Sequence, residues 1–100
     1  MTILEEHKSD ISELCAAHMV NRLYAFGSVL TDKFNNESDI DFVVDFNPIE
    51  VSVYADNYFD FKFSLQDILK RNIDLLEEKA IKNPFFKKAI HQQRQLVYEY

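Results

Sequence analysis

Two aspartates separated by one residue open an alternating segment of the chain. One face would carry Asp39, Asp41, Val43 and Asp45, and the other would carry Ile40, Phe42, Val44 and Phe46. This alternation predicts a strand with an apolar core face and an acidic outer face. Asp39 and Asp41 would then project from the same side, about 6.6 Å apart along the chain. Side-chain rotation can close that gap, so their oxygens can share a divalent cation.

The ligand types at this pair favour Mg²⁺ or Mn²⁺ over zinc, because Cys15 is the lone cysteine and no histidine lies nearby in sequence. Two such ions ~3.5–4 Å apart can clamp the attacking and leaving oxygens of a phosphoryl displacement. A lone Asp-x-Asp in an acidic protein is more often solvated surface. A rigid strand and the mutual repulsion of unpaired acids favour a cation site, so we treat Asp39 and Asp41 as candidate metal ligands and catalytic residues.

Gly27 and Ser28 form a second candidate group, upstream of the aspartates. Gly27 is the only glycine and follows the short apolar segment 22–26, which predicts a buried strand ending in a tight turn. A residue without a side chain lets a phosphate approach the backbone, where amides and the Ser28 hydroxyl can donate to its oxygens. The alternative is an ordinary turn with Ser28 as a helix cap.

The joint spacing is more specific than either half. Gly27-Ser28, ten residues and then Asp39-Ile40-Asp41 resemble the signature of the DNA polymerase beta-like nucleotidyltransferase superfamily. The resemblance implies a third carboxylate from a later strand, and Asp74 is placed correctly for it. Asp74 is a lone acid in the apolar segment 72–76, where burial without a partner would be costly. The alternative for Asp74 is a surface acid of that strand. We interpret the competing acids, Glu77 and Glu78, as solvated charges at the end of the strand.

The resemblance covers essentially the whole chain. Within the superfamily, the chain looks like the minimal nucleotidyltransferases, which consist of the catalytic core alone. It implies that residues 1–100 form a single minimal nucleotidyltransferase domain, with a tail, residues 81–99, that also matches the group. Members are typically paired with a small helical HEPN protein as the antitoxin of a toxin–antitoxin module. The implied activity is Mg²⁺-dependent transfer of AMP from ATP to a tyrosine hydroxyl of the HEPN toxin. Asp39 and Asp41 would bind the nucleotide-associated metal, and Asp74 would join them at a second metal and help deprotonate the hydroxyl.

One stretch departs from the family pattern. Relatives often carry an Arg and a Gly shortly after Gly-Ser, whereas this chain has Val29-Leu30-Thr31-Asp32. Lys33 is the candidate substitute for the missing triphosphate-binding cation, with Gly27 and Ser28 as the other nucleotide-binding residues. The alternative for Lys33 is an exposed helix lysine.

A second class of function stays open, namely a non-catalytic module that neutralises a HEPN partner by contact. This alternative is suggested by the many aromatic residues in one expected helix, namely Tyr54, Tyr58, Phe59, Phe61 and Phe63. One apolar stripe cannot bury all of these rings, so some of them could form a protein interface. Transfer to an antibiotic or to tRNA would need a substrate domain or a basic surface, and the chain offers neither.

Composition limits the partners. One hundred residues with 47% hydrophobic content and a net charge of −6 predict one compact, ordered domain. An acidic chain is a poor ligand for nucleic acid or an anionic membrane surface, so neither partner is expected. Cys15 can form no intrachain disulfide and is expected as a small buried side chain. We expect a cytoplasmic protein without a membrane span, and a homo- or hetero-oligomer is possible.

Periodicity predicts the elements that must position the candidate residues. Helical stripes cover 3–19 and 54–69, a short helix follows at 28–34, and Pro84 opens a last helix. Strands are expected at 22–26, 39–46 and 72–76, while Leu96-Val97-Tyr98 ends the last helix or adds a short strand. The order α-β-α-β-α-β-α predicts an α/β (α+β-like) domain with a small mixed three-stranded sheet flanked by helices. The resemblance implies the nucleotidyltransferase fold.

Overall fold

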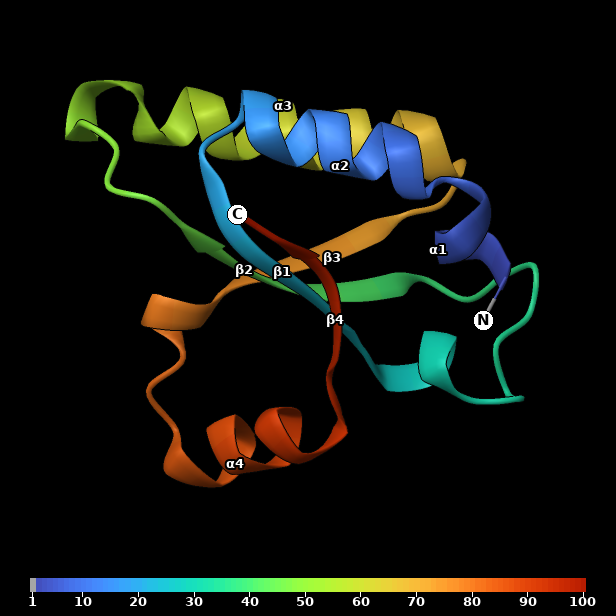
Figure 1. Ribbon diagram of the computed structural model, residues 1–100. Coiled ribbons are helices and arrows are strands. Elements are labelled where there is room, and N and C mark those ends of the chain that lie inside the picture. The colour runs from blue at the N-terminus through green and yellow to red at the C-terminus, as the bar shows by residue number, and fades with distance from the viewer. Residues whose placement is uncertain (1) are drawn as a thin grey trace.

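The computed structural model describes residues 2–100 and is built on a mixed four-stranded sheet (Figure 1). The strands are β1 (Val20–Phe26), β2 (Ile40–Phe46), β3 (Ile73–Glu77) and β4 (Gln95–Glu99), in the spatial order β3-β2-β1-β4. β1 pairs antiparallel with both β2 and β4, whereas β2 and β3 run parallel. The mixed α/β class is confirmed. The strand count of three is wrong, because the tail pairs with the free edge of β1.

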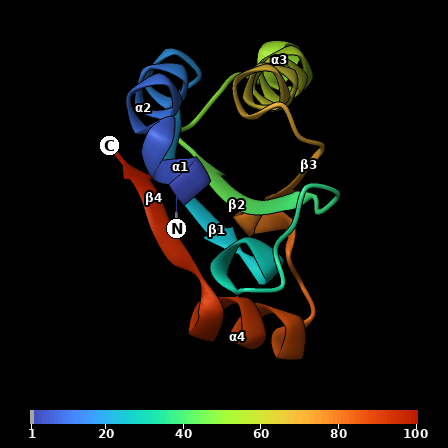
Figure 2. The ribbon, with the colours of Figure 1, turned by 90° about the vertical axis from the view of Figure 1, so that its right-hand side faces the viewer.

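The helices divide between the two faces of the sheet. α2 (Lys8–Ala17) and α3 (Val51–Leu69) cover one face, and α4 (Pro84–Gln93) lies on the opposite side (Figure 2). α3 is the crossover that the parallel pair β2–β3 requires. Its residue Tyr58 donates a hydrogen bond of 2.5 Å to the Leu75 carbonyl and so ties the helix to β3. Within residues 2–100, no helix has the length and apolar character needed to cross a membrane.

The core lies between the sheet and the helices α2 and α3. The predicted core face of β2 is confirmed, because Ile40, Phe42, Val44 and Phe46 are all buried. They pack with Phe61 of α3, whose ring meets that of Phe46 edge-on at 5.9 Å. Each fully buried aliphatic or aromatic side chain contributes about 1.5–3 kcal/mol, so this layer carries much of the stability.

The predicted N-terminal helix, 3–19, is two helices. α1 (Thr2–Glu6) ends before His7, and α2 begins directly after it. The His7 carbonyl accepts from the Ile11 backbone N–H at 2.9 Å, and the His7 side chain makes no capping hydrogen bond. Cys15 is buried on α2 as expected. His18 caps the end of α2, and its Nδ1 lies 2.8 Å from the Leu14 carbonyl oxygen.

The expected short helix at 28–34 is a single 3₁₀ turn, η1 (Gly27–Leu30). Thr31 closes it twice, because its backbone N–H and its hydroxyl both donate to the Ser28 carbonyl at 2.9 Å. Local side-chain hydrogen bonds of this kind compete with helix propagation. A second 3₁₀ turn, η2 (Glu78–Ala80), follows β3. Pro84 opens α4 as predicted, with the Asn83 side chain accepting from the Phe85 and Phe86 amides.

Candidate catalytic site

Gly27, Asp41 and Asp74 come together where β1 ends and β2 and β3 begin. Phe26 at the end of β1 pairs with Asp41, and Asp41 pairs with Asp74 across the parallel strands. Adjacent residues of β2 and β3 are core residues, so the pleat directs Asp41 and Asp74 to the opposite face. Asp39 is exposed and lies one residue before β2, so the expectation that both acids sit within the strand is wrong for Asp39.

Asp74 is exposed on β3. The premise that it is a buried acid needing a partner is therefore wrong. Its pairing with Asp41 nevertheless brings it to the predicted place, because neighbouring strands are only ~4.8 Å apart. Sequence periodicity identified the strand correctly.

The three aspartates act on one another electrostatically. Burial, followed by the nearby charges of Asp74 and Asp39, raises the pKa of the Asp41 carboxyl above its usual range. Within residues 2–100, no group of three or more acidic, histidine or cysteine side chains converges closely enough to hold a metal ion. Mutual repulsion opposes such convergence, and a cation supplies the charge that offsets it. The all-oxygen donor set and its strand spacing fit Mg²⁺ or Mn²⁺.

Gly27 turns the chain directly against Asp41. Its φ of +78° lies in the left-handed region, and a Cβ at this position would lie 2.5 Å from Asp41 Oδ2. Both facts require glycine here. The turn is anchored by Val29, which is buried in the core, while Ser28 stays half-buried at the face of the site. The backbone at Gly27 and the Asp41 carboxylate therefore form one compact corner, in which the carboxylate takes the space that a side chain at position 27 would need.

Lys33 lies in the loop after η1 and is exposed. Its backbone N–H donates to the Thr31 hydroxyl at 3.2 Å, so it belongs to a turn and not to the expected helix. The structure does not bring the Lys33 side chain into a contact with the aspartates that would define a role for it.

Arg71 is a residue that sequence reasoning missed. It precedes β3, and its Nη1 donates to the carbonyls of Asn35 and Ser38 at 2.8 and 2.9 Å. Its guanidinium also stacks 4.5 Å above the Phe34 ring. These contacts tie down the loop that leads into Asp39. No local pattern marks Arg71, since its partners are backbone carbonyls more than 30 residues away in sequence.

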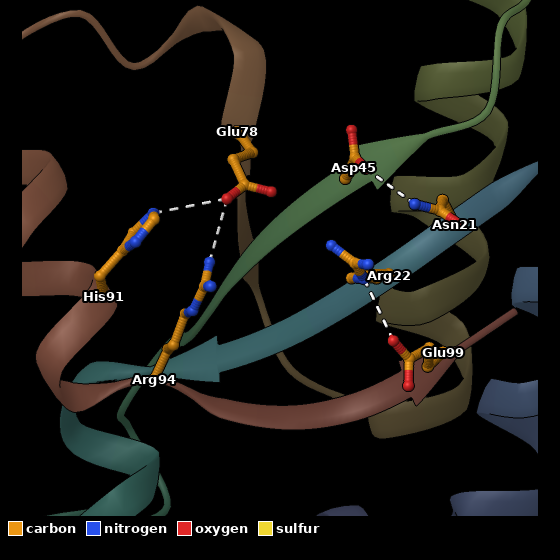
Figure 3. Close-up of polar contacts among 7 residues, drawn as sticks. All are labelled: Asn21, Arg22, Asp45, Glu78, His91, Arg94 and Glu99. Atoms are coloured by element: carbon orange, nitrogen blue, oxygen red, sulfur yellow. Dashed lines mark hydrogen bonds and ion pairs between the residues drawn. The ribbon is translucent and has the colours of Figure 1, made fainter.

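A second missed group fixes α4 on the catalytic side of the sheet (Figure 3). Glu78 Oε1 accepts from Arg94 Nη1 at 3.0 Å and lies 3.4 Å from His91 Nε2. The Arg94 guanidinium lies 3.7 Å from the centroid of the Tyr24 ring. The interpretation of Glu78 as a solvated charge is therefore wrong. The sequence did contain a signal for such pairing, because the segment that follows Glu78, residues 79–98, has five Lys and Arg and no Asp or Glu.

Asp45 shares its face with Asp41 but has protein partners. Asn21 Nδ2 donates to Asp45 Oδ2 at 3.0 Å, and Lys79 Nζ lies 3.6 Å from Oδ1 (Figure 3 shows the Asn21 contact). Two acids on one strand thus have different environments. Asp45 is neutralised by the fold, whereas Asp41 faces only like charge from Asp39 and Asp74.

Comparisons with known proteins assign this arrangement to a family. Residues 4–97 match the family model for the nucleotidyltransferase domain, so the chain belongs to that family. It is 34% identical over 90 residues to "Putative protein adenylyltransferase MJ0128" of Methanocaldococcus jannaschii, covering 90% of this chain and 86% of the relative. The protein is a nucleotidyltransferase, and the sequence-based recognition of that family is confirmed.

Solved structures confirm the fold. One described as a minimal nucleotidyltransferase superimposes with a TM-score of 0.77 at 23% identity, covering 95% of each chain. A chain in the complex of a tri-AMPylated Shewanella oneidensis HEPN toxin with an MNT antitoxin gives a TM-score of 0.65 at 15% identity. That match covers 97% of this chain and 73% of the other.

Proposed function

We propose that this nucleotidyltransferase moves AMP from ATP to a protein hydroxyl, a tyrosine of a HEPN toxin, and acts as the antitoxin of that toxin. The observation that carries the proposal is the corner formed by Gly27 and Asp41, with Asp74 in register beside it. Support also comes from the relative named as an adenylyltransferase and from the neighbour complex that holds an AMPylated HEPN toxin. Residues 1–100 would act as a single catalytic domain.

The proposed roles follow from position. Asp39 and Asp41 would hold the metal that accompanies ATP, and Asp74 would complete a second metal position with them. Bound there, Mg²⁺ supplies charge neutralisation on the phosphates. The backbone at Gly27 and the Ser28 hydroxyl would donate to phosphate oxygens, leaving Lys33 as a more distant point charge.

Asp74 is exposed on β3, beside Asp41 on the neighbouring strand, so an incoming hydroxyl can reach it next to the proposed nucleotide position. It would take the proton as the hydroxyl oxygen bonds to the α-phosphorus. The bond from the α-phosphorus to the bridging oxygen breaks, and pyrophosphate leaves with that electron pair. The protein contributes positioning and electrostatic stabilisation to this displacement.

The test compares two aspartates of the same strand. Asp41→Asn should abolish transfer of label from ATP radiolabelled at the α-phosphate to a co-purified HEPN partner. Its fold should survive, because the change removes a carboxylate that faces like charge. Asp45→Asn is the matched control, since Asp45 shares the face but is paired with Asn21 and Lys79, and it should keep transfer. Continued labelling by Asp41→Asn would show that the site is assigned wrongly.

Calorimetry separates this proposal from the non-catalytic alternative. We expect ATP to bind the wild-type chain with Mg²⁺ and to bind much more weakly without it. Metal-independent or absent binding, with the HEPN partner still neutralised, would establish the contact module instead.

A further inference from the structure

α3 carries an exposed apolar strip that the catalytic site does not use. Phe59 and Phe63 stack with ring centroids 6.0 Å apart and are 49% and 56% exposed. Met19 and Val53 extend the strip and are also about half exposed (48% and 51%). Single exposed apolar residues are ordinary, whereas a contiguous set that includes a stacked aromatic pair indicates an interaction surface.

The strip lines a groove on the outer side of α3. The groove has a volume of about 670 Å³ and lies between the end of α2 and the first half of α3. Its lining includes all four apolar residues of the strip, together with Asp56 and Asp60. We call this surface the α3 groove. It lies on the far side of the sheet from Asp41. α3 packs on the core face of the sheet (Figure 2), whereas Asp41 alternates with the core residues of β2 and so points to the other face.

The charge of the groove is one-sided. Asp56 and Asp60, four residues apart on α3, are both exposed, and the lining contains no Lys or Arg. The only other titratable side chain in the lining, His18, already contacts Asp60 with Nε2 2.6 Å from Oδ2. An acidic rim around an apolar floor repels nucleic acid and anionic lipid, and it attracts an apolar surface flanked by cations.

A second copy of the chain fits this surface poorly. A two-fold contact would place Asp56 and Asp60 of one copy against the same residues of the other, with like charges opposed. The basic helix α4, with Phe85 83% exposed, could meet the groove only head to tail. Such a contact generates open chains unless the rotation happens to close a ring.

We propose that the α3 groove docks a basic amphipathic helix of a partner protein. Apolar side chains at i, i+3, i+4 and i+7 of that helix would pack on Phe59 and Phe63. Its flanking Lys or Arg would pair with Asp56 and Asp60. The groove lies on the α3 side of the sheet and Asp41 and Asp74 lie on the other side, whereas Asp39 lines a neighbouring cavity together with Asp60 and Phe63. The inference goes beyond the proposed function and does not depend on nucleotide transfer.

Two designed peptides test the proposal on the full chain. The first is an amphipathic helix of Leu and Lys with one Trp, about 14 residues long or roughly four helical turns. The second replaces every Lys by Glu. The chain has no Trp, so peptide fluorescence reports binding directly. We expect the Lys peptide to bind at least about tenfold more tightly than the Glu peptide.

Variants then locate the binding. Phe63→Ser should weaken the Lys peptide by about tenfold, as expected for an aromatic anchor. Phe85→Ser on α4, an equally drastic change at an exposed Phe, should leave binding unchanged. The double variant Asp56→Lys/Asp60→Lys should weaken binding of the Lys peptide to a similar extent. Its control is the double variant Asp10→Lys/Glu13→Lys on α2, which changes the net charge by the same amount away from the groove and should have a smaller effect. Circular dichroism of every variant checks that it is folded.

Three results would overturn the proposal. The first is equal binding of both peptides, and the second is binding that Phe63→Ser leaves intact. The third is concentration-dependent self-association of the wild-type chain that Phe63→Ser abolishes, since that would assign the groove to a second copy. If the wild-type chain shows no Mg²⁺-dependent binding of ATP, the proposed function is refuted but this inference is unaffected.

Discussion

Gly27→Ala should destabilise the protein and disable its site through a single methyl group. At φ +78°, an alanine is strained by ~1–2 kcal/mol, partly offset by the lower entropy that alanine gives the unfolded chain. The new Cβ would also lie 2.5 Å from Asp41 Oδ2, so the carboxylate must rotate away. We expect a total cost of about 1–3 kcal/mol, which lowers Tm by roughly 4–8 °C for each kcal/mol.

A double-mutant cycle separates the two causes. Asp41→Ala removes the carboxylate that the methyl group would strike, so in that background Gly27→Ala should cost only the backbone strain. The coupling between the two positions, measured by chemical denaturation, should fall within the ~0.5–3 kcal/mol typical of residues in contact. Calorimetry should also show that Gly27→Ala has lost Mg²⁺-dependent ATP binding. A Gly27→Ala variant that melts like wild type, or a coupling of zero, would refute the geometry of this corner.

Three further outcomes follow from the structure. Burial raises the pKa of the Cys15 thiol to about 12, so on raising the pH the thiol ionises in the unfolded chain before it ionises in the folded one. The free energy of unfolding should therefore fall as pH rises above ~8.5, by up to ~1.4 kcal/mol per pH unit. Urea denaturation at several alkaline pH values should show this slope in the wild type and a reduced slope in Cys15→Ala; equal slopes would contradict it. Arg94→Ala should cost about 1–2 kcal/mol, because it removes the Tyr24 stack and the Glu78 pair. Arg22→Ala, whose pair with Glu99 is exposed, should cost less than Arg94→Ala, and thermal melts giving the reverse order would refute the role of Arg94. Arg71→Ala should speed amide hydrogen exchange in residues 31–39 while leaving exchange in β2 unchanged, and protection unchanged in that loop would show that Arg71 does not hold it.

The central strand could be predicted because it obeys one local rule. Alternation over residues 39–46 identifies the core face of β2 correctly, and the face that carries Asp41 follows from it. The spacing from Gly27 to Asp41 identified, through the family resemblance, two residues that the fold brings together. The spacing could not show how close they lie: the Asp41 carboxylate is so near the Gly27 backbone that a Cβ on residue 27 would collide with it.

The remaining features depend on contacts between distant parts of the chain. β4 exists because its short apolar segment finds the edge of β1, and the same residues read equally well as a helix end. Glu78 looked like a strand-end charge until α4 brought Arg94 and His91 to it. η1 stays a single turn because the Thr31 hydroxyl competes for the Ser28 carbonyl. Such long-range or competing contacts have no signature in a short window of sequence.

The acid-free segment 79–98 gives the molecule an electric polarity. It carries five cations in a chain of net charge −6, and most of it forms α4 and β4 beside the catalytic face. Under the proposed function, α4 would offer the phosphates of ATP a basic surface at one edge of the site, although Lys79 and Arg94 already offset Asp45 and Glu78. Orientation of this kind raises the rate of productive encounters and weakens as salt shortens the Debye length. Under the proposed function, α4 would therefore also bias the direction from which a nucleotide approaches.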